Sequence, residues 1–165
     1  MSVNYSRFGW LLFVGLLLGV VGCDHTTKHL ALSELKNGAD VSLVKNVLSL
    51  EYVTNTDTAF GVLGSVFSAE TRRVLILILQ GLTIVFLGGW LVRRFPVISN
   101  IERAAFALVL GGAVGNFSDR LLRGHVIDFI HLRHWPVFNV ADIAVCIGAG
   151  LLFLASRKHP TRATS

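Results

Sequence analysis

Residues 74–92 read VLILILQGLTIVFLGGWLV, an apolar run of 19 residues that lies between Arg73 and Arg93. A helix needs about 20 apolar residues to cross a bilayer, with a usual range of about 17–25. This stretch is long enough to predict a transmembrane helix unaided. It therefore decides the class of the protein.

The composition of the 165-residue chain agrees with a membrane protein. Hydrophobic residues make up 53% and charged residues 15%, whereas soluble domains carry about 25% charged residues. This excludes an ordinary soluble domain and a disordered chain, and two cysteines are too few for a disulfide scaffold. The length predicts a single integral membrane domain over residues 1–165. The net charge of +5 is scattered between apolar runs, so we expect no nucleic-acid partner.

Three further apolar runs are shorter, or are interrupted by a polar residue. Residues 8–23 carry no charge, residues 104–118 end before Asp119, and residues 136–156 contain Asp142. They qualify as spans only if polar residues lie at the membrane edge, where costly ionisable groups usually serve a function. We predict an all-α membrane protein with four transmembrane helices at about residues 8–30, 72–94, 102–121 and 136–156.

Lysine and arginine in short connections predict the orientation, because they concentrate on the cytoplasmic side. Arg7, the basic loop 93–103 and the basic C-terminal tail would share that side. Both termini would then be cytoplasmic. Residues 24–73 and 119–135 would face outward.

The outward segment 41–63 is rich in β-branched and aromatic residues and partly alternates between polar and apolar. This pattern predicts two or three short strands, which form a small extracytoplasmic β-sheet. Residues 65–73 predict a short interfacial helix that leads into the next span.

Polar residues near the outer edge form a set, although each also has a structural explanation. Asp24 and Lys28 share a helix face and can pair, or they form a solvated helix end. Asn55 and Asp57 lie in a turn-like stretch, and such residues commonly bond their own backbone.

The stretch GGAVGNFSDR, residues 111–120, packs polar groups beside small ones. Gly111 and Gly115 have the spacing that lets two membrane helices approach closely. Gly112, Asn116 and Arg120 recur every four residues on one face, and Asp119 lies at the same end. Asn116 alone could simply form a hydrogen bond between helices, but Asn116, Asp119 and Arg120 together indicate a functional site.

Two acidic residues are surrounded by apolar neighbours, Asp128 in VIDF and Asp142 in FNVAD. Two carboxyl groups that share one proton can act as a general base on water and a general acid. This chemistry hydrolyses a peptide bond without a metal or a covalent nucleophile. Asn139 is three residues before Asp142 and could orient it.

Other interpretations fit less well. His131 and His134, with Asp128, have a spacing that could hold a metal, but the Trp-Pro that follows suggests that no helix continues there. We therefore expect no metal or cofactor. Residues 20–23, VVGC, resemble the cleavage box of a lipoprotein precursor, but three later spans disfavour that reading. A small channel or carrier is a further alternative, although no polar face runs through the spans.

Taken together, these motifs resemble the lipoprotein signal peptidase family, also called signal peptidase II or prolipoprotein signal peptidase. The resemblance extends over nearly the whole chain and rests on DHTTK at 24–28, Asn55 with Ala59-Phe60, GGAVGNFSDR at 111–120, VIDF at 126–129 and FNVAD at 138–142. The third and last of these blocks are the most specific.

The resemblance implies an aspartic endopeptidase of the bacterial inner membrane, with its active site at the outer leaflet. Asp128 and Asp142 would be the catalytic pair that activates a water against the bond before a diacylglyceryl-modified cysteine. The partners implied are prolipoprotein substrates and membrane lipids, the protein would be a monomer, and globomycin would occupy the same site. The residues implied to support the site or bind substrate are Asp24, Lys28, Asn55, Gly112, Asn116, Asp119, Arg120, Asn139 and Ala141.

Two departures from the family pattern suggest a divergent paralogue. Asp57-Thr58 stands where the family usually has small residues, so Asp57 could modify specificity. Asp128 and Asp142 are 14 positions apart, a shorter spacing than is common in the family. A catalytically inactive homologue that binds lipidated peptides, as in resistance or immunity, is therefore an alternative.

Overall fold

The computed structural model describes residues 3–38, 40–56 and 68–157, with side chains from Arg7 onward. Four helices and three strands make up this part of the chain. In order they are α1 (Val3–Glu34), β1 (Val41–Val44), β2 (Leu48–Asn55), α2 (Ala69–Arg94), α3 (Asn100–Arg123), β3 (Val126–Leu132) and α4 (Val140–Arg157).

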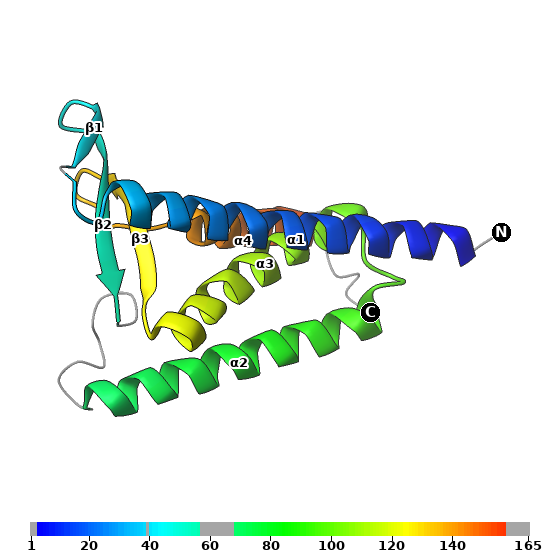
Figure 1. Cartoon of the computed structure of the whole chain (residues 1–165). Coiled ribbons are helices and arrows are strands. Elements are labelled where there is room, and N and C mark those ends of the chain that lie inside the picture. The colour runs from blue at the N-terminus through cyan, green and yellow to red at the C-terminus, as the bar shows by residue number, and fades with distance from the viewer. Residues whose placement is uncertain (1–2, 39, 57–67, 158–165) are drawn as a thin grey trace.

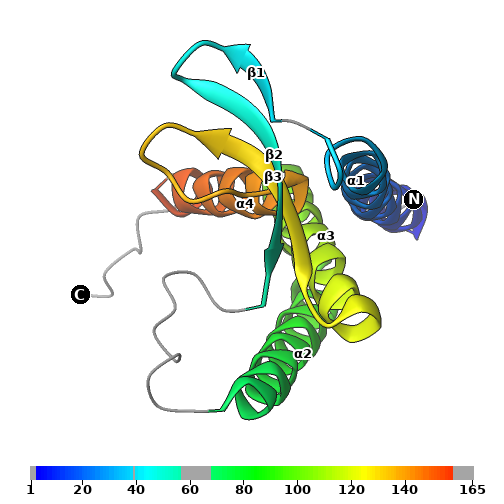
Figure 2. The ribbon, with the colours of Figure 1, turned by 60° about the vertical axis from the view of Figure 1, so that its left-hand side comes forward.

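The helices extend away from the sheet, which crosses one end of the molecule (Figure 1). α3 is central, since it packs against α1, α2 and α4, and Figure 2 shows it between α4 and α2. The start of α1 and the turn between α2 and α3 lie at the end opposite the sheet. The sheet therefore occupies one end of the molecule, and the turn between α2 and α3 the other.

Within the described part of the chain, three helices are long and apolar enough to cross a membrane, over Arg7–Glu34, Ala69–Arg94 and Val140–Arg157. Their flanks expose large apolar side chains, such as Leu11, Val85 and Phe86, which suits contact with lipid. α3 is less apolar because it is the most enclosed helix, and small and polar residues face its neighbours. The mostly helical class is confirmed, and α3 as a fourth span stays a prediction.

Serine residues start two of the helices. Ser68 caps α2 by accepting a hydrogen bond from the Thr71 backbone nitrogen at 3.3 Å. Ser99 and Glu102 form a reciprocal capping box at the start of α3, which satisfies two backbone donors. Residues 69–73, predicted to belong to a separate interfacial helix, are instead the first turns of α2, because the cap at Ser68 starts one continuous helix.

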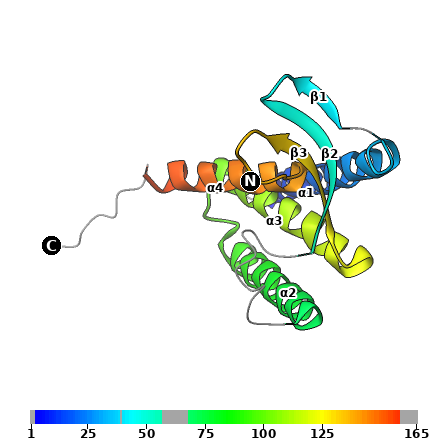
Figure 3. The same ribbon diagram turned by 90° about the vertical axis from the view of Figure 1, so that its left-hand side faces the viewer.

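The three strands form an antiparallel sheet in the order β1-β2-β3, which faces the viewer in Figure 3. β1 and β2 confirm the strands predicted in residues 41–63, and residues 57–63 lie outside the described part. The third strand is β3, from a segment interpreted as a connection. That interpretation was wrong because the pairing of β3 with β2 is long-range, with Val53 opposite Asp128 and Asn55 opposite Val126.

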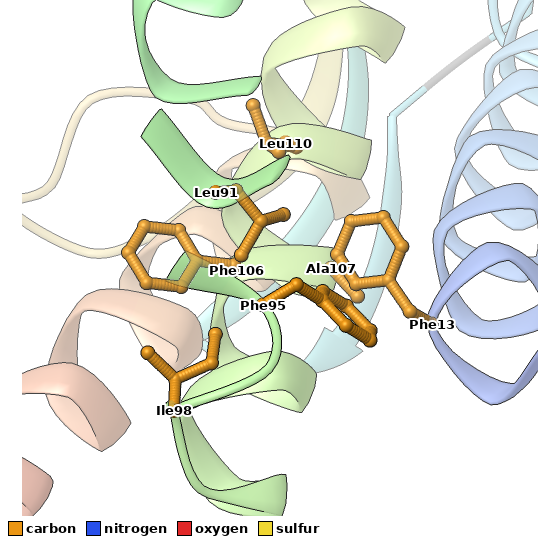
Figure 4. Packing of buried hydrophobic residues seen from close by; sticks show 7 residues of the cluster. All are labelled: Phe13, Leu91, Phe95, Ile98, Phe106, Ala107 and Leu110. Carbon is orange, nitrogen blue, oxygen red and sulfur yellow. The ribbon is translucent and has the colours of Figure 1, made fainter. Parts of the chain in front are cut away.

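Two apolar clusters fix the helices at opposite ends. The cluster in Figure 4 joins α1, α2 and α3 through Phe13, Leu91, Phe95, Ile98, Phe106, Ala107 and Leu110. Trp10 stacks on Phe95 with ring centroids 3.7 Å apart. At the sheet end, Ala31 of α1 packs with Ile127 and Phe129 of β3, so the sheet is anchored to the C-terminal part of α1.

Glycines let α3 approach its neighbours closely, as the small-residue spacing predicted. A Cβ added at Gly111 would lie 2.9 Å from the Cβ of Val20 on α1. At Gly112 it would lie 2.4 Å from the backbone oxygen of Ala141 on α4. These separations leave no room for a side chain, so the glycines set the distance between helices.

Gly112→Ala is expected to lower stability by about 1–3 kcal/mol, because the Ala141 backbone cannot move aside cheaply. The α3–α4 displacement should also reduce activity. Thermal unfolding in detergent measures the first effect. Gly89→Ala in α2 is the matched control, since nothing lies within 4 Å of its added Cβ; equal melting temperatures for the two variants would contradict the packing argument.

Candidate active site

Asp142 and Asn139 meet at the start of α4 in a reciprocal pair. The Asn139 side-chain oxygen accepts from the Asp142 backbone nitrogen at 3.1 Å, and Asp142 Oδ2 accepts from the Asn139 backbone nitrogen at 3.1 Å. This is the geometry of a capping box, in which residues three apart satisfy each other's backbone donors. The same contacts that begin the helix hold the Asp142 carboxyl group in place.

Asp128 is placed beside this pair by β3. It is 3% exposed, and its Oδ1 accepts from Asn139 Nδ2 at 2.6 Å. Its Oδ2 accepts from Asn55 Nδ2 at 2.8 Å, which β2 supplies from the adjacent strand. Asn139 therefore bonds to both acidic residues and brings together two parts of the chain that the sequence could only suggest were close.

Asn116 of α3 completes the polar cluster. Its Nδ2 donates to Asp142 Oδ1 at 2.8 Å, while its Oδ1 accepts from Asn139 Nδ2 at 3.1 Å and from Lys28 Nζ at 2.9 Å. Because Lys28 can only donate, it fixes which end of the Asn116 amide faces Asp142. Polar residues from β2, α3, β3 and α4 thus converge on one point.

Burial raises the pKa of Asp128 above its usual value. The hydrogen bonds from Asn55 and Asn139 oppose this rise, the nearby charge of Asp142 adds to it, and that of Lys28 opposes it. A raised pKa favours a protonated Asp128.

A buried network of charged side chains contacts the cluster through Lys28, which bonds to Asn116. Lys28 Nζ lies 2.7 Å from Asp24 Oδ2 and 2.8 Å from Asp119 Oδ2, and all three side chains are fully buried. Arg123 also contacts Asp119. The solvated helix end considered for Asp24 and Lys28 is therefore excluded, since neither side chain reaches solvent.

Asp24 also connects this network to α4. Its Oδ1 accepts from the Ala141 backbone nitrogen at 2.9 Å, and a Cβ at Gly115 would lie 2.7 Å from its Oδ2. A backbone nitrogen is present in almost every residue type, so the sequence did not reveal that Ala141 bonds to Asp24. Arg123 was also missed, although its spacing of four from Asp119 on a helix was a usable signal.

The remaining candidates lie at different distances from the cluster. Arg120 is buried at the outer end of α3 and interacts electrostatically with Asp128 and Asp142. Asp57 lies outside the described residues. His131 faces Glu51 at 3.2 Å rather than Asp128, and the described residues contain no group of three or more His, Cys, Asp or Glu side chains that could hold a metal.

Known proteins resemble the chain in sequence and in structure. A family model described as signal peptidase (SPase) II matches residues 16–158. The lipoprotein signal peptidase of Syntrophotalea carbinolica is 40% identical over 97% of this chain and 98% of its own length. That of Pseudoalteromonas translucida is 38% identical over 89% and 87%.

Two solved structures, both described as a bacterial membrane enzyme, share the fold. The first has a TM-score of 0.77 and 25% identity, and covers 93% of this chain and 92% of the solved chain. The second has a TM-score of 0.72 and 26% identity, over 93% and 94%. Sequence and fold thus agree over nearly the whole length, and this chain belongs to the signal peptidase II family.

Proposed function

We propose that the protein is an aspartic endopeptidase that cleaves prolipoproteins before the diacylglyceryl-modified cysteine. The observation that carries the proposal is the arrangement of Asp128 and Asp142 around Asn139, which bonds to both. Two carboxyl groups in one partly buried, hydrogen-bonded cluster can form an acid–base pair that acts on a water.

The structure supports different roles for the two acids. Asp128 enters protonated, because burial raises its pKa. Asp142 is the general base of the proposal, because it lies in the first turn of α4, where the helix dipole favours negative charge. It also accepts hydrogen bonds from Asn116 Nδ2 and the Asn139 backbone.

The first step forms a tetrahedral intermediate. Asp142 takes a proton from the water as the water oxygen attacks the carbonyl carbon before the modified cysteine. Asp128 gives its proton to the carbonyl oxygen, which yields a neutral diol.

The second step breaks the peptide bond. Asp142 passes its proton to the cysteine nitrogen, which leaves as an amine, and Asp128 recovers a proton from one diol hydroxyl. Both carboxyl groups return to their starting protonation states. The proposed steps use neither a metal nor a covalent bond between enzyme and substrate.

Several of the surrounding residues serve as positioning groups in this proposal. Asn55, Asn116 and Asn139 hold the carboxyl groups through the bonds described above, and Gly112 and Ala141 allow α3 and α4 to meet. Arg120 and the buried pair Asp24 and Lys28 support the site electrostatically, as does Asp119. Asp57 adds a charge two positions after Asn55, which motivates an influence on substrate choice.

The proposed setting is the bacterial inner membrane, with α3 as the fourth span of a single monomeric domain. Both termini would be cytoplasmic and the acids would lie at the outer leaflet. The two-ended arrangement of the elements supports this, because the sheet, whose strand β3 carries Asp128, and the start of α2 share one end. There, acyl chains of the substrate can stay in lipid while its scissile bond reaches the acids.

Two alternatives are less well supported. An inactive binder was motivated by the short spacing between the acids, but one side chain, Asn139, bonds to both despite it. A lipoprotein precursor would be cut before Cys23, whereas α1 continues as one helix through Cys23 to Glu34.

The purified protein is expected to cleave a fluorescent diacylglyceryl lipopeptide before the modified cysteine, as mass spectrometry of the products would show. Activity should fall as the pH rises through the raised pKa of Asp128, because the general acid loses its proton. The fall should therefore come at a pH above the ordinary carboxyl pKa of about 4. Retention of the lipopeptide without product at any pH would indicate a binder instead.

A further inference from the structure

A cavity of about 370 Å³ opens between the outer ends of α1 and α3, lined by His25, Thr26, His29, Leu30 and Arg123. None of these five side chains forms the hydrogen bonds that hold Asp128 or Asp142. The cavity is therefore separate from the proposed catalytic cluster and has no role in the mechanism above.

The polar lining of this cavity is basic or hydroxylic. His25 and His29 are four residues apart and share a face of α1, while Arg123 reaches the cavity from the last turn of α3. The adjacent acid, Asp119, is fully buried behind the lining, with its Oδ1 3.9 Å from His25 Nδ1.

The charge of Asp119 is already opposed by Lys28, 2.8 Å away, and by Arg123. The network of Asp24, Lys28, Asp119 and Arg123 has two acids and two bases. His25 and His29 are additional donors at its surface, so the cavity favours an anion.

In the proposed orientation, the cavity lies near the boundary between acyl chains and headgroups. His25 and His29 occupy the same turns of α1 as Asp24 and Lys28, near the outer end of the span. In the lining beside them, Leu30 is 55% exposed. A basic hollow with an exposed leucine suits a molecule with an anionic head and an apolar tail.

We propose that this cavity binds the phosphate headgroup of an anionic phospholipid of the outer leaflet. His25, His29 and Arg123 donate hydrogen bonds to the phosphate oxygens, and Thr26 adds a hydroxyl. The acyl chains pass along Leu30. A soluble phosphate offers the same head but no tail for this leucine, so the lipid is the favoured occupant.

The test uses the full-length protein and two lipids with the same acyl chains, phosphatidylglycerol and phosphatidylcholine. Native mass spectrometry of protein released from mixed nanodiscs measures how much of each lipid stays bound. The wild type is expected to retain phosphatidylglycerol at least about 5-fold over phosphatidylcholine. The double variant His25→Ala/His29→Ala should lower this preference to about 2-fold or less, and His29→Lys should preserve it, because lysine still donates hydrogen bonds to a phosphate.

Lys45→Ala is the matched control, since it removes an exposed basic residue from the turn between β1 and β2. It should leave the preference unchanged. An equal preference in the double variant and the wild type would overturn the proposal. Displacement of the bound lipid by millimolar glycerol phosphate would also overturn it, because the cavity would then recognise a soluble phosphate.

Discussion

Asp142→Asn and Asp128→Asn are each expected to lower kcat for lipopeptide cleavage by about 10²–10⁴-fold, the usual contribution of a general acid or base. The reason is that each proton transfer in the proposed mechanism uses one of these carboxyl groups. An amide of nearly the same shape cannot take the proton from water or give one to the carbonyl oxygen. Single-turnover measurement of product formation in detergent separates this loss from slow product release.

Both variants should also lose stability. At position 142 the two carboxyl oxygens accept from Asn116 Nδ2 and from the Asn139 backbone nitrogen. At position 128 they accept from Asn139 Nδ2 and Asn55 Nδ2. An amide at either position must turn a donor toward one of these donors, so both variants should melt at a lower temperature than the wild type.

Glu51→Gln is the matched control for both variants. Glu51 is an acidic residue of the same sheet, and it pairs with His131 rather than with the cluster. Its replacement should change kcat by less than about 2-fold, in keeping with the small contribution of exposed pairs. Full activity of either Asp variant would remove the acid–base pair from the mechanism.

The sequence predicted the elements whose signal is local. The apolar run 74–92 predicted α2, and the glycine spacing at 111–115 predicted a tightly packed α3. The spacing of four between Asp24 and Lys28 predicted that these two side chains share a face. Each of these depends on helical periodicity or hydrophobic length, which neighbouring residues determine among themselves.

The sequence did not predict features that depend on distant partners. β3 was interpreted as a connection because Asp128 and His131 break its apolar pattern, and only pairing with β2 makes it a strand. The depth of Asp24 and Lys28 was also ambiguous, since an i,i+4 pair has the same spacing whether solvated or buried. It is α3 and α4, far along the chain, that close over this pair.

Lys28→Met is expected to destabilise the protein by roughly 3–5 kcal/mol, the cost of removing one partner from a buried ion pair. Asp24 would lose the cation 2.7 Å away in a place where no water reaches it. Asn116 would lose the donor that fixes its amide, so its Nδ2 would no longer be held toward Asp142. Thermal unfolding measures the first consequence, and residual kcat in the folded fraction measures the second.

The double variant Lys28→Met/Asp24→Asn separates charge from packing. Asn at position 24 still offers an oxygen to the Ala141 backbone nitrogen, and Arg123 still pairs with Asp119. The double variant removes one acid and one base, so the buried network is neutral again and much of the lost stability should return. The activity should stay low, because no donor holds the Asn116 amide in its orientation. Lys45→Met at the exposed turn should change neither quantity.

A wild-type melting temperature for Lys28→Met would mean that the buried network contributes nothing to folding. Recovery of both stability and kcat in the double variant would mean that Lys28 acts only by balancing charge and does not orient Asn116.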